Sequence, residues 1–132
     1  LYFTIYTRRR MKNSLNWFEI PATDFDRAIK FYNAILDAEL YCTEMNGYKM
    51  GFFPMDEGAV GGAVVTGEFY TPSADGSVIY LNAGENLSTV LDRVEPNGGK
   101  ILMPKTLITE EIGYMAMFLD TEGGKIALHS SK

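Results

Sequence analysis

The chain has 132 residues, 46% hydrophobic and 13% aromatic, a composition typical of one globular domain and unlike that of a disordered chain. Its formal net charge of −5 disfavours nucleic acid and anionic membranes as partners, because phosphate binding needs clustered Lys and Arg. One cysteine, Cys42, and one histidine, His129, exclude an internal disulfide and a Cys/His zinc cluster. We therefore expect a reducing, cytoplasmic setting, and no apolar run approaches the roughly 18 residues that a membrane span requires.

The first ten residues differ in character from the rest of the chain. "LYFTIYTRRRM" places a short apolar run before its arginines, whereas a secretory signal has its positive charge first. We interpret residues 1–10 as a leader or tag-derived segment, with Met11 as the native start of a single domain over residues 11–132. Without Arg8, Arg9 and Arg10 the net charge would change from −5 to −8, so the domain proper is acidic.

A strand and an amphipathic helix open this domain. "LNWFEI", residues 15–20, reads as a strand that Pro21 ends, and Thr23 can cap a helix with Asp26 three residues on, as in a capping box. Apolar residues then recur at helical spacing, which predicts one buried helix face. They are Phe25, Ala28, Ile29, Tyr32, Ile35 and Leu36.

Three strands complete the first module, which spans residues 14–67. We predict them at residues 38–45, 48–53 and 61–67. The pair Asn46-Gly47 joins the first two, and Asn-Gly between strand-like runs is a strong hairpin signal. The resulting order is βαβββ.

The same order then starts again. Residues 68–76, "EFYTPSADG", read as a linker, and module two covers residues 77–131. It begins with a strand at residues 77–83 and continues with a helix capped by Asn86. "KILMPKTLI", "GYMAMFLD" and "KIALHS" are its three further strands.

The two modules repeat with an offset of about 62 residues, from Asp24 to Asn86, which indicates two similar units in one α+β chain. One helix cannot cover both faces of a four-stranded sheet. The uncovered face of each sheet must therefore be buried against something else. Two such faces brought together would leave a cleft.

The tandem βαβββ pattern resembles the vicinal oxygen chelate superfamily, which includes glyoxalase I, extradiol dioxygenases and bleomycin-resistance proteins. The resemblance rests on "FEIPATDFDRAIKFYNAIL", "VIYLNAGENLSTVLDRVEPNGGKIL" and "GYMAMFLDTEGGKIALHS", in that order. The last segment has the form Phe118-x-Asp120-x-Glu122-Gly123, similar to the family's closing turn. The resemblance implies a glyoxalase-type or bleomycin-resistance-type cleft between the modules.

Enzymes of the family bind a divalent metal at four strand positions that are typically His or Glu. By this resemblance the positions fall on Trp17, on Val78 or Ile79, on Ala127, and within "GGAVV" at residues 61–65. None of these side chains can ligate a divalent ion, which prefers oxygen or imidazole donors. We therefore predict no metal at the usual site and no other cofactor.

Strand alternation points to other residues in the cleft. Glu19 shares a strand face with Trp17, and His129 shares one with Ala127, so Glu19 and His129 could act together in general acid/base catalysis. Alternatively, Glu19 anchors a cationic ligand. Trp17 offers a stacking surface or an apolar wall. Further ligand-lining candidates alternate along two strands, and the sequence leaves open which set faces the cleft: Tyr48, Met50 and Phe52 on one, Tyr114 and Phe118 on the other.

Three functions are compatible with this pattern. The first is binding of a small organic molecule in an apolar cleft without the usual metal, anchored by Trp17 and Glu19. The second is a glyoxalase-type lyase or isomerase with a displaced metal site built from Glu19, Glu44 and His129. The third is a non-catalytic interaction domain, and for the protein as a whole we expect a homodimer. Cys42 is expected to be a buried structural thiol.

Overall fold

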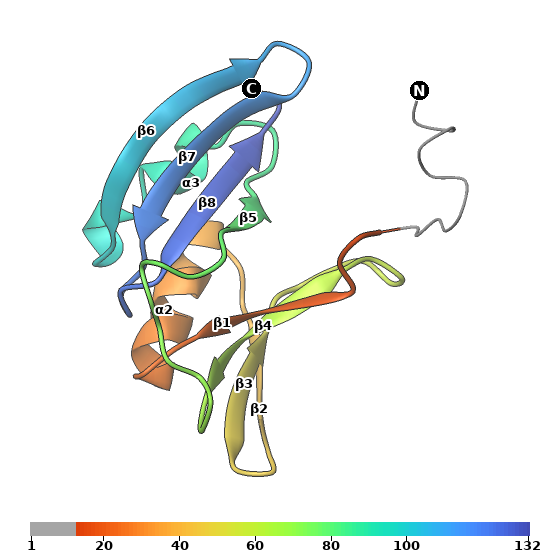
Figure 1. The fold of residues 1–132 in the computed structure, drawn as a ribbon, viewed down its shortest axis with the longest axis vertical. Helices are drawn as coiled ribbons and strands as arrows, with labels where there is room; N and C mark the ends of the chain where they lie inside the picture. Colours follow the sequence, from red (N-terminus) through yellow and green to blue (C-terminus); the bar gives the residue numbers. More distant parts are fainter. Residues whose placement is uncertain (1–12) are drawn as a thin grey trace.

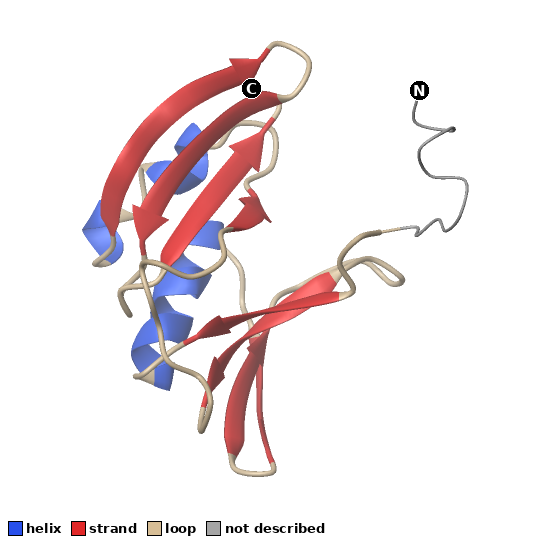
Figure 2. Cartoon of the chain, in the orientation of Figure 1, coloured by secondary structure: helices blue, strands red, loops and turns tan. Residues whose placement is uncertain are grey.

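The computed structural model describes residues 13–132 and contains two four-stranded sheets, one in each module (Figures 1 and 2). The predicted leader at residues 1–10 and the predicted start at Met11 lie outside the described residues. No helix within residues 13–132 is both long enough and apolar enough to cross a membrane.

The first module has the predicted βαβββ order. Its sheet, the first sheet, is ordered β1-β4-β3-β2, with β1 parallel to β4 and the other pairs antiparallel. The hairpin between β2 and β3 turns at Asn46 and Gly47, both at positive φ, as the Asn-Gly signal predicts. The elements are β1 (Trp17–Pro21), α2 (Phe25–Leu36), β2 (Tyr41–Met45), β3 (Tyr48–Phe52) and β4 (Gly61–Thr66).

The second module repeats this topology, and its sheet, the second sheet, is ordered β5-β8-β7-β6 with β5 parallel to β8. Its helical segment is shorter than predicted, because the chain leaves α-helical geometry after one turn and continues as a 3₁₀ turn before Gly98. The elements are β5 (Ile79–Asn82), α3 (Ser88–Leu91), η1 (Glu95–Asn97), β6 (Lys100–Thr109), β7 (Gly113–Leu119) and β8 (Lys125–Ser130).

Helix α2 begins one residue later than the capping-box interpretation requires. The cap is Asp24, whose carboxylate accepts a hydrogen bond from the Arg27 amide at 3.1 Å, so the predicted Thr23–Asp26 box is wrong. The helix ends at Asp37, which adopts a left-handed conformation with φ 48°.

One hydrophobic core joins the two modules. Phe31 of α2 lies 5.8 Å from Phe118 of β7 between ring centroids, and Tyr32 lies 5.5 Å from Phe53 next to β3. Adjacent residues of one helix thus contact both modules, and burial of two aromatic side chains stabilises this arrangement by several kcal/mol. The remaining core residues with essentially no exposure include Ala28, Ile35, Val64, Leu87, Val94 and Leu128.

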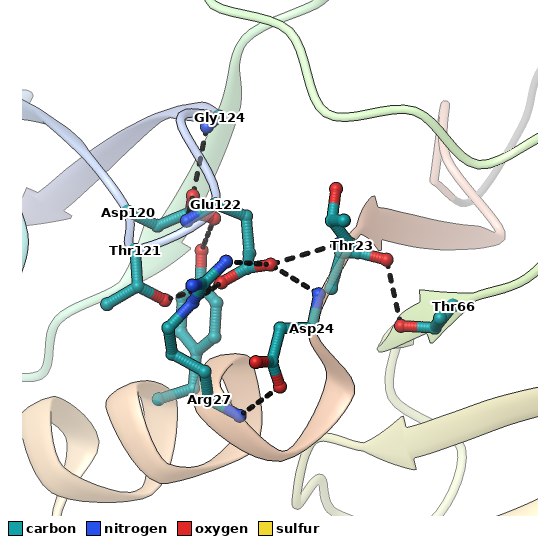
Figure 3. Close-up of polar contacts among 10 residues, drawn as sticks. Thr23, Asp24, Arg27, Thr66, Asp120, Thr121, Glu122 and Gly124 are labelled. Atoms are coloured by element: carbon teal, nitrogen blue, oxygen red, sulfur yellow. Dashed lines mark hydrogen bonds and ion pairs between the residues drawn. The ribbon is translucent and has the colours of Figure 1, made fainter.

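A polar connection between the modules lies beside this core (Figure 3). Glu122, in the turn between β7 and β8, accepts hydrogen bonds from the backbone amides of Thr23 and Asp24 at 3.0 and 2.7 Å. Arg27 donates to the same carboxylate at 2.7 and 3.1 Å. A carboxylate of the second module therefore caps the amino end of the first module's helix, where the helix dipole favours negative charge.

Asp120 stabilises this turn by hydrogen bonds to its backbone. Its carboxylate accepts the Glu122 and Gly124 amides at 2.9 Å each and the buried Tyr32 hydroxyl at 2.7 Å. Burial raises the pKa of Asp120, although these three donors oppose the shift. Burial also acts to raise the pKa of Glu122, but the donors from Arg27, Asp24 and Thr121 outweigh it, and the pKa is lowered.

Replacing Glu122 with Gln is expected to lower the free energy of unfolding by about 1–3 kcal/mol, because two helix amides lose a charged acceptor. The folded-state pKa of Glu122 lies below its ordinary value of 4.5, so its stabilisation is present above that value and is lost as the pH falls through the folded pKa. Urea unfolding between pH 7 and 3 should show a shallower acid decline in Glu122→Gln. Glu110→Gln, in the β6–β7 turn, is the control, and equal acid declines in both variants would contradict the capping role.

Candidate functional site

The first sheet has one face covered by α2 and one open face. Register places Trp17 beside Gly61, Glu19 beside Ala63, and Ala63 beside Phe52, so these side chains share the open face. The predicted candidates Tyr48 and Met50 lie on the same face by strand alternation. Gly61 and Ala63 of β4 are small, so the larger side chains on the neighbouring strands can approach each other above them. The Trp17 and Phe52 ring centroids are 5.8 Å apart.

Glu19 is held in place by two donors. The Tyr70 hydroxyl donates to one carboxylate oxygen at 2.5 Å, and the Trp17 indole N–H donates to the other at 3.3 Å. Tyr70 belongs to the predicted linker, and its ring packs edge-on against Tyr48 at 5.7 Å. The hydrogen bond to Glu19 raises the pKa of Tyr70, with a smaller contribution from burial. The linker thus supplies a hydrogen-bond donor to Glu19.

A crevice of about 1060 Å³ separates the neighbouring edges of the two sheets, between β1 and β5. Trp17 and Glu19 form part of one wall, and Tyr80 and Asn82 form part of the other. Apolar groups dominate the remaining lining, which is typical of small-molecule sites. The other lining residues include Leu15, Leu36, Phe53, Pro54, Met55, Asp56, Val60, Ser77 and Val78.

A second hollow of about 220 Å³ lies against Glu19, lined by linker residues Pro72 and Ser73 and by Lys125 of β8. Glu19 is therefore the one charged residue that lines both hollows in the described part of the chain. Its position where the two hollows meet makes it the central polar group of the candidate site.

His129 does not join Glu19. It lies on the open face of the second sheet, and its Nε2 is 2.6 Å from the Ile112 carbonyl oxygen. Together with Tyr80 and Asn82, His129 lines another hollow, of about 380 Å³. Glu19 has Trp17 and Tyr70 as its hydrogen-bond partners instead. Glu19 and His129 share no hydrogen bond and line different hollows, so the structure does not bring the two predicted residues together.

Two predicted ligand-lining residues face the core rather than a cavity. Phe118 has no exposed surface and packs on Phe31, and Tyr114 packs against the same core. Strand alternation predicted correctly that they share a face, but helix packing decides that this face is the covered one. We do not retain Tyr114 and Phe118 as ligand contacts.

The four positions implied by the family's metal site hold Trp17, Val78, Ala127 and residues of β4 in this structure. The alternative position, Ile79, is partly buried against the core and also lines the crevice. Within residues 13–132 no three His, Cys, Asp or Glu side chains gather as ligands for an ion. Glu44 lies opposite Lys49 in the β2–β3 register, on the other face of the first sheet from Glu19, so the three residues of the displaced metal site are not brought together either.

Three residues of the site were missed from the sequence. Tyr80 and Asn82 alternate with the core residues Ile79 and Leu81, a pattern that could have placed them on the open face. Tyr70 could not have been found in this way, because a linker has no strand period. Cys42 was expected to be buried but is exposed on the edge strand β2.

The sequence model of the Glyoxalase/Bleomycin resistance protein/Dioxygenase superfamily matches residues 14–128. The chain belongs to this superfamily, as its repeated βαβββ architecture indicates. No curated protein matches the chain.

Solved structures share the fold at low sequence identity. A glyoxylase/bleomycin resistance protein/dioxygenase domain from Frankia sp. EAN1pec aligns with a TM-score of 0.68 and 13% identity over 92% of this chain and 100% of that one. A Leishmania major glyoxalase I aligns with a TM-score of 0.62 and 19% identity, over 93% and 87%. A glyoxalase I mutant from Zea mays aligns with a TM-score of 0.65 and 17% identity over 94% of this chain, which spans about half (48%) of the maize protein.

Replacing Glu19 with Gln is expected to lower the pKa of Tyr70 towards its ordinary value of 10.0, because the charged acceptor is the main cause of the raised value. The Tyr70 ring-carbon NMR shift, assigned with Tyr70→Phe, would be followed from pH 8 to 12. Glu44→Gln, on the opposite face, should leave the Tyr70 pKa unchanged. An unaltered titration in Glu19→Gln would show that the contact is not formed in solution.

Proposed function

We propose that this protein binds a small organic molecule in the crevice between β1 and β5, without the metal that many members of its superfamily use. The observation that carries the proposal is a crevice of about 1060 Å³ whose walls are mostly apolar and include only two charged side chains, Glu19 and Asp56. Such a combination suits a ligand with one polar or charged group on an apolar body.

Trp17 is the proposed stacking surface. Its side chain is 38% exposed, lines the crevice, and is steadied by the hydrogen bond to Glu19 and by contact with Phe52. A large aromatic surface that is fixed in position loses little conformational entropy when a ligand stacks on it. Glu19 supplies the polar contact.

Metal content distinguishes this proposal from the alternative, a divalent-metal-dependent lyase or isomerase of the glyoxalase type. We expect purified protein to contain far less than one equivalent of Zn, Ni, Mn or Fe by elemental analysis, and excess EDTA to leave the melting temperature within about 1 °C. One equivalent of a tightly held ion, with destabilisation by the chelator, would favour the metal-dependent enzyme instead.

A second candidate is a dimerising interaction domain, and one observation favours association of two copies. Tyr41 and Met45, on the open face of edge strand β2, are 72% and 51% exposed, and Tyr80 of β5 is 50% exposed. Exposed apolar side chains on the open faces of both sheets are a feature that association with a second copy would bury. Sizing chromatography with light scattering would determine the mass, and a dimer whose interface filled the crevice would contradict ligand binding there.

The proposal also includes a cytoplasmic location and no role in nucleic-acid binding. The single thiol, Cys42, is exposed and suits a reducing compartment, and the net charge of −5 disfavours phosphate backbones.

Trp17 is the only tryptophan, so its emission reports directly on the site. We expect a screen of aromatic and alicyclic compounds to give ligands that quench or shift this emission. Trp17→Ala should weaken their affinity about tenfold or more by calorimetry, because the stacking surface is lost. Phe69→Ala, at a residue 88% exposed and outside the crevice, should have no effect. Unchanged affinity in Trp17→Ala would refute the assignment.

A further inference from the structure

We infer that the crevice selects organic cations, with Glu19 as the charge partner and the surrounding aromatic rings as contact surfaces. This inference rests on the proposed function and specifies the chemical class of its ligand. It follows from the charges of the crevice lining, the fixed position of Glu19 and the distribution of the rings.

The charges of the lining are of one sign. Glu19 and Asp56 are its two carboxylates, and none of the described residues that line the crevice is Lys or Arg. Lys125 lines the smaller hollow, which Glu19 also lines, and it forms no ion pair with Glu19 in the described residues. An anion would meet two carboxylates in a largely apolar space, where repulsion is screened less than in bulk water. A cation would meet favourable potential instead.

Glu19 retains capacity for a ligand. A carboxylate has about four lone-pair sites, and Tyr70 and Trp17 donate one hydrogen bond each. Those two donors hold the carboxylate in place, and Glu19 as a residue is partly exposed and lines the crevice. Neither donor carries a formal positive charge, so the negative charge of Glu19 has no ionic partner in the described structure.

Aromatic rings line the crevice that Glu19 also lines. The Trp17 indole N–H, at the edge of the ring, donates to a Glu19 oxygen at 3.3 Å, so an organic cation paired with Glu19 lies beside this ring and gains cation–π attraction where it covers the ring face. Tyr80, 50% exposed, lines the opposite wall. A cation within about 6 Å of an aromatic centroid is attracted to the ring face, most strongly for Trp.

A neutral apolar ligand would fit this site less well. It would cover Glu19 and remove water from the carboxylate without supplying a compensating charge, and this desolvation opposes binding. A quaternary or tertiary ammonium group on an apolar body supplies that charge and covers the apolar walls at the same time. Ligand charge therefore sets specificity, while apolar contact contributes to affinity for either kind of molecule.

The test compares three probes by Trp17 quenching and ligand-observed NMR on the full chain. They are the cation benzyltrimethylammonium, its neutral isostere neopentylbenzene and the anion phenylacetate, in one buffer with a small amount of dimethyl sulfoxide. We expect the cation to bind at least about fivefold more tightly than the neutral probe, and the anion most weakly. Raising NaCl from 50 to 500 mM should weaken cation binding severalfold and leave the neutral probe unchanged.

Two variants assign the preference to Glu19. In Glu19→Gln, which keeps an acceptor for Tyr70, the affinity for the cation should fall to within about twofold of the neutral probe and lose its salt dependence. Glu44→Gln removes the same charge on the opposite face of the sheet and should bind all three probes as the unaltered protein does. Melting temperatures of both variants confirm that they are folded.

The outcomes separate this inference from the proposed function. Equal binding of the cation and its isostere, or a preference that survives in Glu19→Gln, would overturn the cation inference while leaving the crevice as a binding site. A cation preference lost equally in both variants would also overturn it, because it would then reflect overall charge. No binding by any of the three probes would refute both.

Discussion

The Glu122 carboxylate connects the two modules, because it satisfies the free amides at the start of α2 from a turn of the second module. Those amides need an acceptor in any fold, and here the acceptor lies 98 residues from Asp24 in sequence. Separation of the modules would break these hydrogen bonds and the Arg27–Glu122 ion pair, and would expose the shared core to water. Tyr32 and Asp120 extend the same connection into the core.

The placement of the modules determines the candidate site. With α2 packed between the modules, β1 and β5 lie at neighbouring edges of the two sheets (Figure 1). Residues of both strands line the crevice. The linker that joins the modules passes close to β1, where Tyr70 contacts Glu19. The packing of the two modules around α2 therefore produces both features. It brings Glu122 to the start of α2, and it leaves the crevice beside Glu19.

Sequence reasoning succeeded where a local period or a local signal governs the structure. Alternation grouped Trp17 with Glu19 and Tyr48 with Phe52, and register places all four on one face. It failed where contacts between distant segments decide. Alternation states which residues share a face but not which face a helix covers, and for this reason Phe118 was assigned to a cleft although it belongs to the core.

The sequence by itself determined the repeated βαβββ order and most element boundaries, because each depends on residue type and short-range spacing. Only the tertiary structure decided that Asp24 and Glu122 meet, that Glu19 is partnered by Tyr70, and that His129 lies in a separate hollow. These facts depend on how two sheets and a helix pack together. Side-chain volume and long-range hydrogen bonding determine that packing, and neither has a period that a single sequence displays.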